Sequence, residues 1–305
     1  MAPAGPSSAR LQVLLAALCF GTTGTAQALG PDGADPVGVG AARILVGGAA
    51  LVVIALLARR GGLRRGSWAP APVAAAVAGV AVYQLAFFAA VADTGVAVGT
   101  IVALGSAPTL TGLLEWIVDR RRPERRWAAA TALACAGVVL LALSGGDASV
   151  SAPGIALAVV AGGAYASYTL AAKRLMKDGH APESVMAVAF GFGAIALAPA
   201  LAASGPGWLL QTDGIALALF LGLVPTAAAY VLFARGLRGL RASETATLTL
   251  AEPLTAGVLG AVVLSEPLTA ASATGAGLVL AGLLALAVRL PGAARPVAAV
   301  EHAAA

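Results

Sequence analysis

The sequence predicts an all-α polytopic membrane protein with ten transmembrane helices, arranged as two inverted five-helix repeats. Three observations lead to this fold class. Of the 305 residues, 59% are hydrophobic and 11% are charged, whereas about 25% of the residues of a soluble domain are charged. Apolar runs of membrane-spanning length recur along the chain. In addition, similar positions recur 145 residues apart, and the basic loops of one half match non-basic loops of the other.

A transmembrane helix needs roughly 17–25 apolar residues. We expect such helices at 11–29, 38–58, 71–90, 96–118, 127–144, 154–172, 184–203, 213–234, 243–264 and 270–290. The first run follows Arg10 and has features of a signal peptide. We expect it to remain as the first span, because 11–29 is long for the apolar part of a signal and has a repeat partner. The short loops leave no room for a large domain outside the membrane.

The basic residues predict the orientation of these helices, because cytoplasmic loops of membrane proteins are enriched in lysine and arginine. Of the nineteen lysines and arginines, all except Arg43 fall before the first run, in the segments that follow runs 2, 4, 6 and 8, or at the end of the chain from Arg289 on. The loops at 30–37, 91–95, 145–153, 204–212 and 265–269 contain none. We therefore expect both termini in the cytoplasm of a cell whose inner, or plasma, membrane holds the protein.

The offset of 145 residues indicates a duplication, with residues 1–145 and 146–292 as the two repeats and 293–305 as a disordered tail. Pro108 matches Pro253, and Gly137 matches Gly282. The arginines at 120–126 match the non-basic segment 265–271. A duplicated unit of five spans must be inverted in the membrane, which moves its positive loops to the opposite ends of the helices. Inverted repeats support alternating access around a site near the bilayer midplane.

Three segments of the second half carry a family resemblance: residues 223–230 (LVPTAAAY), 249–254 (TLAEPL) and 264–282, which begins Leu-Ser-Glu-Pro-Leu-Thr. With the ten spans, they resemble the EamA family of the drug/metabolite transporter superfamily over about residues 10–290. The resemblance implies a secondary transporter that exports small metabolites, amino acids or drugs. Where members often have a second acidic-Pro pair, this chain has Ala107-Pro108.

Glu252 is the strongest candidate site residue, because a carboxylate at mid-membrane depth costs roughly 2.5–3.5 kcal/mol on insertion scales and often marks a functional site. It either faces substrate or protons in a central cavity or stabilises its helix as a buried acid. Pro253 and Pro108 remove backbone donors, so we expect them to loosen their helices. Glu115, beside Trp116 and the arginines from 120 on, is interpreted as an interfacial anchor paired with arginine.

Four further residues complete the predicted substrate-binding or coupling site. Arg43 either extends to the membrane surface or recognises an anionic group. Gln84 bonds to substrate or to a neighbouring helix. Tyr165 and Tyr230 are interpreted as cavity-lining residues.

Enzyme signatures are absent from the sequence. Its two histidines, His180 and His302, fall in a loop and the tail, so we expect no metal site, no catalytic residues and no cofactor. The net charge of +5 is spread over short loops and predicts no nucleic-acid partner. The expected partners are a small-molecule substrate, protons as the coupling ion and the lipid bilayer. The sequence is also compatible with a homodimer. The alternatives to export are an intramembrane lipid-modifying enzyme and a membrane biogenesis factor.

Overall fold

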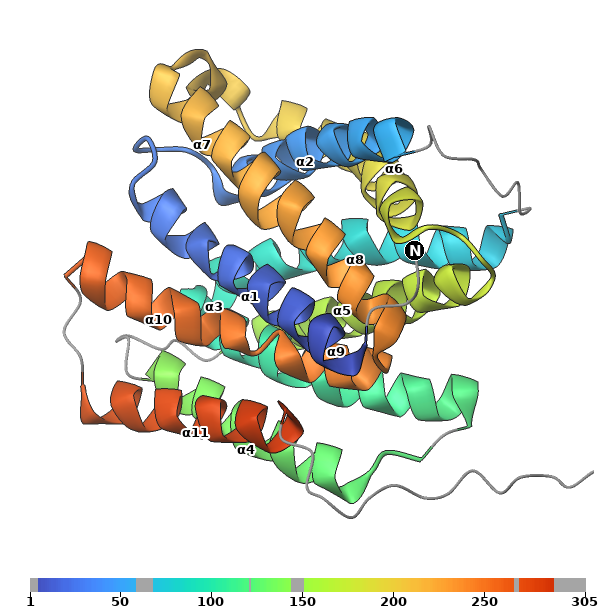
Figure 1. Ribbon diagram of the computed structural model, residues 1–305. Coiled ribbons are helices and arrows are strands. Elements are labelled where there is room, and N and C mark those ends of the chain that lie inside the picture. Colours follow the sequence, from blue (N-terminus) through green and yellow to red (C-terminus); the bar gives the residue numbers. More distant parts are fainter. Residues whose placement is uncertain (1–4, 59–67, 121, 144–150, 266–268, 288–305) are drawn as a thin grey trace, which may run out of the picture.

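The computed structural model describes residues 5–58, 68–120, 122–143, 151–265 and 269–287, and within these residues every regular element is a helix (Figure 1). The predicted tail at 293–305 lies outside them. The first half contains α1 (Pro6–Ala28), α2 (Pro36–Ala58), α3 (Pro70–Asp119) and α4 (Arg125–Leu143). The second half contains α5 (Ala152–Lys177), α6 (Pro182–Ala203), η2 (Pro206–Leu210), α7 (Thr212–Gly222), η3 (Leu223–Ala228), α8 (Ala229–Gly239), α9 (Ala242–Leu248), α10 (Ala251–Val263) and α11 (Ala270–Ala287).

Eight segments of the described chain are long and apolar enough to cross a membrane, which confirms a multi-pass membrane protein. They are Pro6–Ala28, Pro36–Ala58, Pro70–Gly95, Val98–Asp119, Ala152–Lys177, Pro182–Ala203, Thr212–Gly239 and Ala242–Val263. The other two predicted spans correspond to α4, with 19 residues, and to α11, a shorter apolar helix. The helices begin where the sequence favours it: α1, α3, α5 and α6 each have proline in their first two positions, where its missing N–H costs nothing.

Three interruptions fall inside the expected spans or between them. Spans 3 and 4 form one long element, α3, which kinks at Gly95 with φ 79° and ψ 161°. This is a conformation that glycine adopts at little cost. Span 8 contains a π-helical turn, η3, around Pro225. Span 9 divides into α9 and α10 between Leu248 and Ala251.

Helices from the two halves pack against one another throughout the bundle. α2 packs on α6, α4 on α11, α1 on α8 and α10, and α5 on α3. In Figure 1, α4 and α11 lie side by side at one edge of the bundle, and α2, α6 and α7 lie toward the other. Small residues permit the close approaches, as in other membrane bundles. A Cβ atom added at Gly137 would lie 2.5 Å from the Gly275 carbonyl oxygen.

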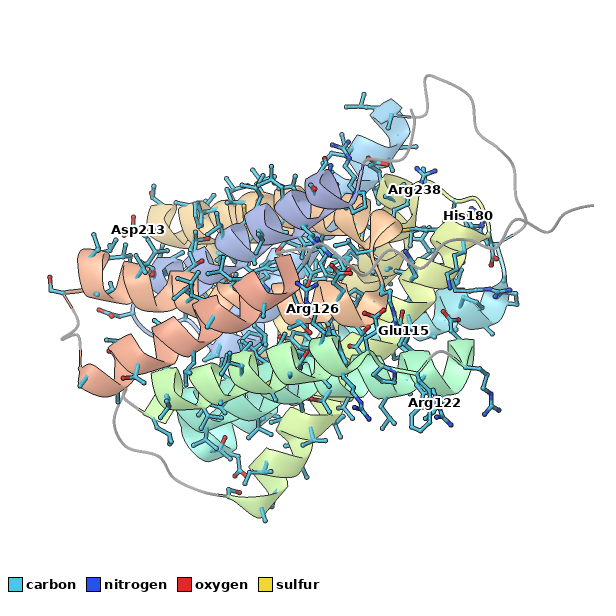
Figure 2. All side chains as sticks on the ribbon, turned by 60° about the horizontal axis from the view of Figure 1, so that its bottom comes forward. Glu115, Arg122, Arg126, His180, Asp213 and Arg238 are labelled. Atoms are coloured by element: carbon cyan, nitrogen blue, oxygen red, sulfur yellow. The ribbon has the colours of Figure 1, made fainter. Side chains whose placement is uncertain are left out.

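One end of the bundle gathers the described basic residues, and we call it the basic end. Ion pairs join helix termini there: Arg10 with Glu244, Lys177 with Asp119, Arg235 with Glu183, and Arg241 with both Glu115 and Glu124. Figure 2 shows Arg122 and Arg238 toward this end and Asp213 at the opposite end. The described lysines and arginines other than Arg43 therefore lie on one side, as their positions in the sequence predict.

Candidate functional site

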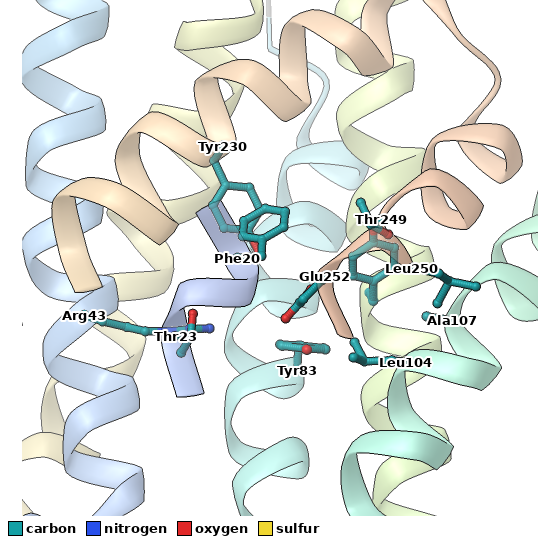
Figure 3. A pocket seen from close by; sticks show the side chains of 11 residues that line it. Phe20, Thr23, Arg43, Tyr83, Leu104, Ala107, Tyr230, Thr249, Leu250 and Glu252 are labelled. Atoms are coloured by element: carbon teal, nitrogen blue, oxygen red, sulfur yellow. The ribbon is translucent and has the colours of Figure 1, made fainter. Parts of the chain in front are cut away.

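A pocket in the middle of the bundle brings together residues from both halves of the chain (Figure 3). It contains about 500 Å³ of empty space, a volume that includes space open to the surroundings. The first half contributes Phe20, Thr23, Arg43, Tyr83, Leu104 and Ala107, and the second half contributes Tyr165, Tyr230, Thr249, Leu250 and Glu252. Substrate pockets combine such an apolar lining with a few polar groups that orient the ligand.

Glu252 reaches the pocket from the first turn of α10, directly after the break between α9 and α10. Pro253 accounts for this break, because it has no N–H to donate to the carbonyl of Thr249, four residues earlier. The Glu252 N–H instead donates to that carbonyl at 2.9 Å, and the Leu250 N–H donates to Thr247 at 3.1 Å. Tight three-residue turns therefore replace the α-helical pattern and place Thr249, Leu250 and Glu252 on the pocket wall.

Arg43 enters the same pocket from α2, opposite Glu252 (Figure 3). Its Nη2 donates to Gln84 Oε1 at 3.0 Å, and Gln84 Nε2 donates to the Gly40 carbonyl at 3.1 Å. Gln84 is 3% exposed and is not itself part of the pocket lining. It therefore holds the guanidinium in position. The structure brings Arg43 and Gln84 together, with Arg43 on the wall of the central pocket.

Glu252 and Arg43 do not form a salt bridge with each other. Among the described residues, the Glu252 carboxylate has no hydrogen-bond or ion-pair partner, and the side-chain partner of Arg43 is Gln84. The Nε of Arg43 is buried with no hydrogen-bond partner there. A carboxyl group and a guanidinium group thus face one pocket with unused hydrogen-bonding capacity.

Aromatic side chains form much of the remaining wall. Tyr230 packs on Phe20 with ring centroids 5.0 Å apart, and on Phe190 at 4.1 Å. Tyr165 lies 6.3 Å from Tyr83, and its hydroxyl lies 3.3 Å from Thr249 Oγ1. Tyr165 and Tyr230 thus line the pocket at the positions proposed from the sequence.

Several pocket residues were not identified from the sequence. One of them is Tyr83, the neighbour of Gln84 in the sequence, and in Figure 3 its ring lies beside the Glu252 carboxylate. Phe20, Thr23 and Thr249 carry no charge inside an apolar run, so composition does not distinguish them from packing residues. A signal for Thr249 was available, because it stands four residues before Pro253.

Pro108 lies inside α3, which continues through it. Since Pro108 has no N–H, the carbonyl of Leu104 lacks its usual helical donor. Leu104 lines the pocket. Thr249 also lines it, and Pro253 likewise has no N–H to donate to the Thr249 carbonyl. Each proline therefore removes one α-helical hydrogen bond to the carbonyl of a pocket-lining residue.

Glu115 lies outside this pocket and is 4% exposed. Its Oε1 accepts a hydrogen bond from the Ala242 N–H at 3.2 Å, and its Oε2 accepts one from Ser243 Oγ at 2.5 Å. Arg241 Nε lies 3.4 Å from the same carboxylate. The predicted pairing with arginine is confirmed, but the partner comes from the turn between α8 and α9 and not from residues 120–126.

Within the described residues, no group of three histidine, cysteine, aspartate or glutamate side chains is arranged to hold a metal ion.

Comparison with known families identifies the chain. The model of the EamA-like transporter family matches it twice, at residues 7–143 and 152–288. The chain belongs to the EamA-like transporter family. The two matches cover both halves of the bundle, so each half is one EamA-like repeat, and the pocket lies where the two repeats meet.

Relatives of this EamA-like protein support the assignment. It is 44% identical, over 90% of its length and 92% of the relative's, to a protein of Bacillus subtilis (strain 168) named uncharacterized transporter YwfM. It is 33% identical to uncharacterized protein PA1977 of Pseudomonas aeruginosa, over 86% of its own length and 88% of the relative's. A crystal structure with a TM-score of 0.79 and 23% identity covers 94% of the chain, aligns over all of its own chain and shares the fold.

Proposed function

We propose that this protein is a secondary transporter that exports small organic metabolites, amino acids or drugs across the inner membrane by alternating access. The observation that carries the proposal is the central pocket, which is lined by both repeats and contains Glu252. Transporters built from inverted repeats bind their solutes at this place, near the bilayer midplane and at the repeat interface.

The packing of α4 on α11 supports a two-fold relation between the repeats. Gly137 approaches Gly275 and Val279, and Gly282 approaches Ala130 and Ala134. An offset of 145 residues exchanges these two sets of contacts: Gly137 with Gly282, Ala130 with Gly275, and Ala134 with Val279. A self-complementary contact of this kind is the mark of a two-fold axis.

The same contacts indicate the direction of that axis. The earlier residues of α4 face the later residues of α11, so the two helices are antiparallel. A two-fold axis that exchanges antiparallel helices is perpendicular to them, and it lies in the membrane plane if both helices span the bilayer. This arrangement is the one that ten spans in two inverted halves require. Each half then rocks against the other around the shared pocket.

The charges of the pocket favour a solute that carries both a positive and a negative group. Arg43, held by Gln84, offers guanidinium donors to an anionic group such as a carboxylate. Glu252 faces the same space, and the ring of Tyr83 beside it favours a cation through its π face (Figure 3). A dipolar solute gives each charge a partner, whereas a neutral solute would leave both charges desolvated and unpaired.

Glu252 is also the proposed coupling group. A carboxylate that binds either a proton or a cationic solute lets one exclude the other, which is the minimal arrangement for exchange of protons against solute. Among the described residues that line the pocket, Glu252 is the one with a carboxyl group.

Untargeted profiling of culture medium tests the proposal. Cells that overproduce the wild type, the Glu252→Gln variant or no added protein are compared, with membrane insertion of both proteins checked by detergent extraction. We expect a small set of dipolar compounds to accumulate outside the cells only with the wild type. Identical media from all three cultures, with folded protein present, would overturn the export function. Turnover of a lipid headgroup by purified protein would then favour an intramembrane enzyme.

A further inference from the structure

The short helix α9 separates the pocket from the basic end of the bundle. Six of its seven side chains are buried: Ala242, Ser243, Thr245, Ala246, Thr247 and Leu248. It contacts α1, α3, α4, α5, α8 and α11, so it lies among helices of both repeats. Its carboxyl end continues directly into Thr249 and Leu250, which line the pocket. A solute that leaves the pocket toward the basic end therefore meets α9.

Polar contacts from four other helices fix the beginning of α9. The Glu115 carboxylate of α3 accepts hydrogen bonds from the Ala242 N–H, the Ser243 N–H and the Ser243 hydroxyl. Arg10 of α1 pairs with Glu244 at 2.7 Å. Trp127 of α4 donates from its Nε1 to the Ser243 carbonyl and to Thr247 Oγ1. Lys173 of α5 fixes the turn that precedes α9, where its Nζ donates to the carbonyls of Leu237, Arg238 and Leu240.

Among the residues that the structure describes, the first repeat shows no comparable set of contacts at the equivalent place. An offset of 145 residues takes the turn at Leu240 to the kink at Gly95. The residues equivalent to Glu115, Arg10, Trp127 and Lys173 are Gly260, Ile155, Ser272 and Ala28, so no charge is conserved between the two ends. Among the described residues at that end, the side-chain hydrogen bond between α3 and the start of α5 joins Asp93 and Ser151.

We propose that α9 is the gate of the transport pathway at the basic end, closed in this structure, and that Glu115 is the positioning residue that holds it. This inference rests on the proposed transport function. The basic end is the one expected to be cytoplasmic, so the contacts favour a resting state that is closed to the cytoplasm. The opposite end, where the described residues form fewer such contacts between helices, opens first. Entry of a cytoplasmic solute then requires the Glu115 and Glu244 contacts to break.

Cysteine labelling of the full chain tests the gate without any assay of transport. The chain carries Ala246→Cys inside α9, with Cys19→Ser and Cys135→Ser to remove the native thiols. A membrane-impermeant maleimide is applied to inside-out vesicles, which expose the basic end if it is cytoplasmic. We expect slow labelling of the parent protein and labelling about tenfold or more faster with Glu115→Ala or Arg10→Gln.

Glu124→Ala is the matched control. Glu124 also approaches Arg241, at 3.8 Å, but its side chain is 74% exposed and no hydrogen bond joins it to α9. We expect Glu124→Ala to label at the parent rate. If both Glu115→Ala and Arg10→Gln label no faster than Glu124→Ala, the gate is overturned. Arg10→Gln keeps the test decisive if Glu115→Ala folds poorly.

A crosslink separates this inference from the proposed function. Arg10 and Glu244 pair through the ends of two long side chains, so a short, reducible bis-thiosulfonate crosslinker between Arg10→Cys and Glu244→Cys, in the chain without native thiols, should hold α9 in place. In proteoliposomes loaded with the compounds identified by medium profiling, we expect the crosslinker to stop flux and a reductant to restore it. Wild-type flux after complete crosslinking overturns the gate and leaves transport intact. A wild type that moves no solute, together with the expected labelling pattern, instead contradicts the transport function alone.

Discussion

Glu252 and Ala107 are equivalent positions of the two repeats, 145 residues apart, and their side chains line the same pocket. The next residue is proline in both cases, Pro253 and Pro108. Both repeats therefore have a proline at this place, whereas only the second repeat has a carboxyl group before it. A pocket with one carboxylate can bind one proton or one cationic group at this place, which makes Glu252 the residue whose substitution is most informative.

We expect Glu252→Gln to remove the dependence of transport on a pH gradient while counterflow exchange of solute remains measurable. Glutamine keeps the size of the side chain and cannot ionise, so proton binding is lost and the pocket shape is kept. The measurement is uptake into proteoliposomes at a series of imposed pH gradients. Glu124→Gln, at an exposed carboxylate, serves as control. Unchanged pH dependence in Glu252→Gln would remove this residue from coupling.

Gln84→Leu is expected to weaken binding of the transported solute through Arg43. A hydrogen bond to a charged group contributes about 1.5–3 kcal/mol, so loss of the Gln84 acceptor should raise KM about tenfold or more. An analogue of the solute that lacks the anionic group should show little change between wild type and variant. Equal losses for solute and analogue would instead indicate that Gln84 only supports the fold. Gln211→Leu, at an exposed position, is the control.

The membrane-protein class, the basic end and much of the pocket could be predicted from the sequence. The length of the apolar runs, the charge of the loops and a carboxylate within an apolar run can each be recognised in the sequence alone. Arg43, Tyr165, Tyr230 and Glu252 come from four different helices, and the structure places all of them at one pocket.

Contacts that depend on how helices pack were not visible in this way. Glu115 was expected to pair with arginines a few residues further on, yet its partner Arg241 is 126 positions away and meets it only because α3 lies beside the turn before α9. Predicting the split of span 9 into α9 and α10 requires recognising that Pro253 has no N–H to donate to the carbonyl of Thr249, four residues earlier. Whether a threonine such as Thr249 faces a pocket or a neighbouring helix depends on the rotation of its helix.

The orientation of the bundle predicts which positions are accessible from each side of the membrane. A single cysteine at Arg122, at the basic end, should react with an impermeant maleimide only in inside-out vesicles. A cysteine at Asp213, at the opposite end, should react in intact cells or spheroplasts (Figure 2). Labelling of the Arg122 position from outside would reverse the assigned orientation, and with it the side on which the α9 gate opens.

The close contact between α4 and α11 predicts that the stability of the protein depends on small residues at this contact. In Gly275→Ala the new Cβ atom would lie 2.7 Å from the Gly137 carbonyl oxygen and from the Leu141 N, which are backbone atoms that cannot rotate away. Overpacking of this kind costs about 1–3 kcal/mol. Gly277→Ala is a matched control on the same helix, because a Cβ atom there meets no atom within 4 Å. We expect the thermal unfolding midpoint of purified protein in detergent to fall for Gly275→Ala and to stay the same or rise for Gly277→Ala. Equal midpoints for the two variants would contradict the close packing of α4 on α11, on which the two-fold relation between the repeats depends.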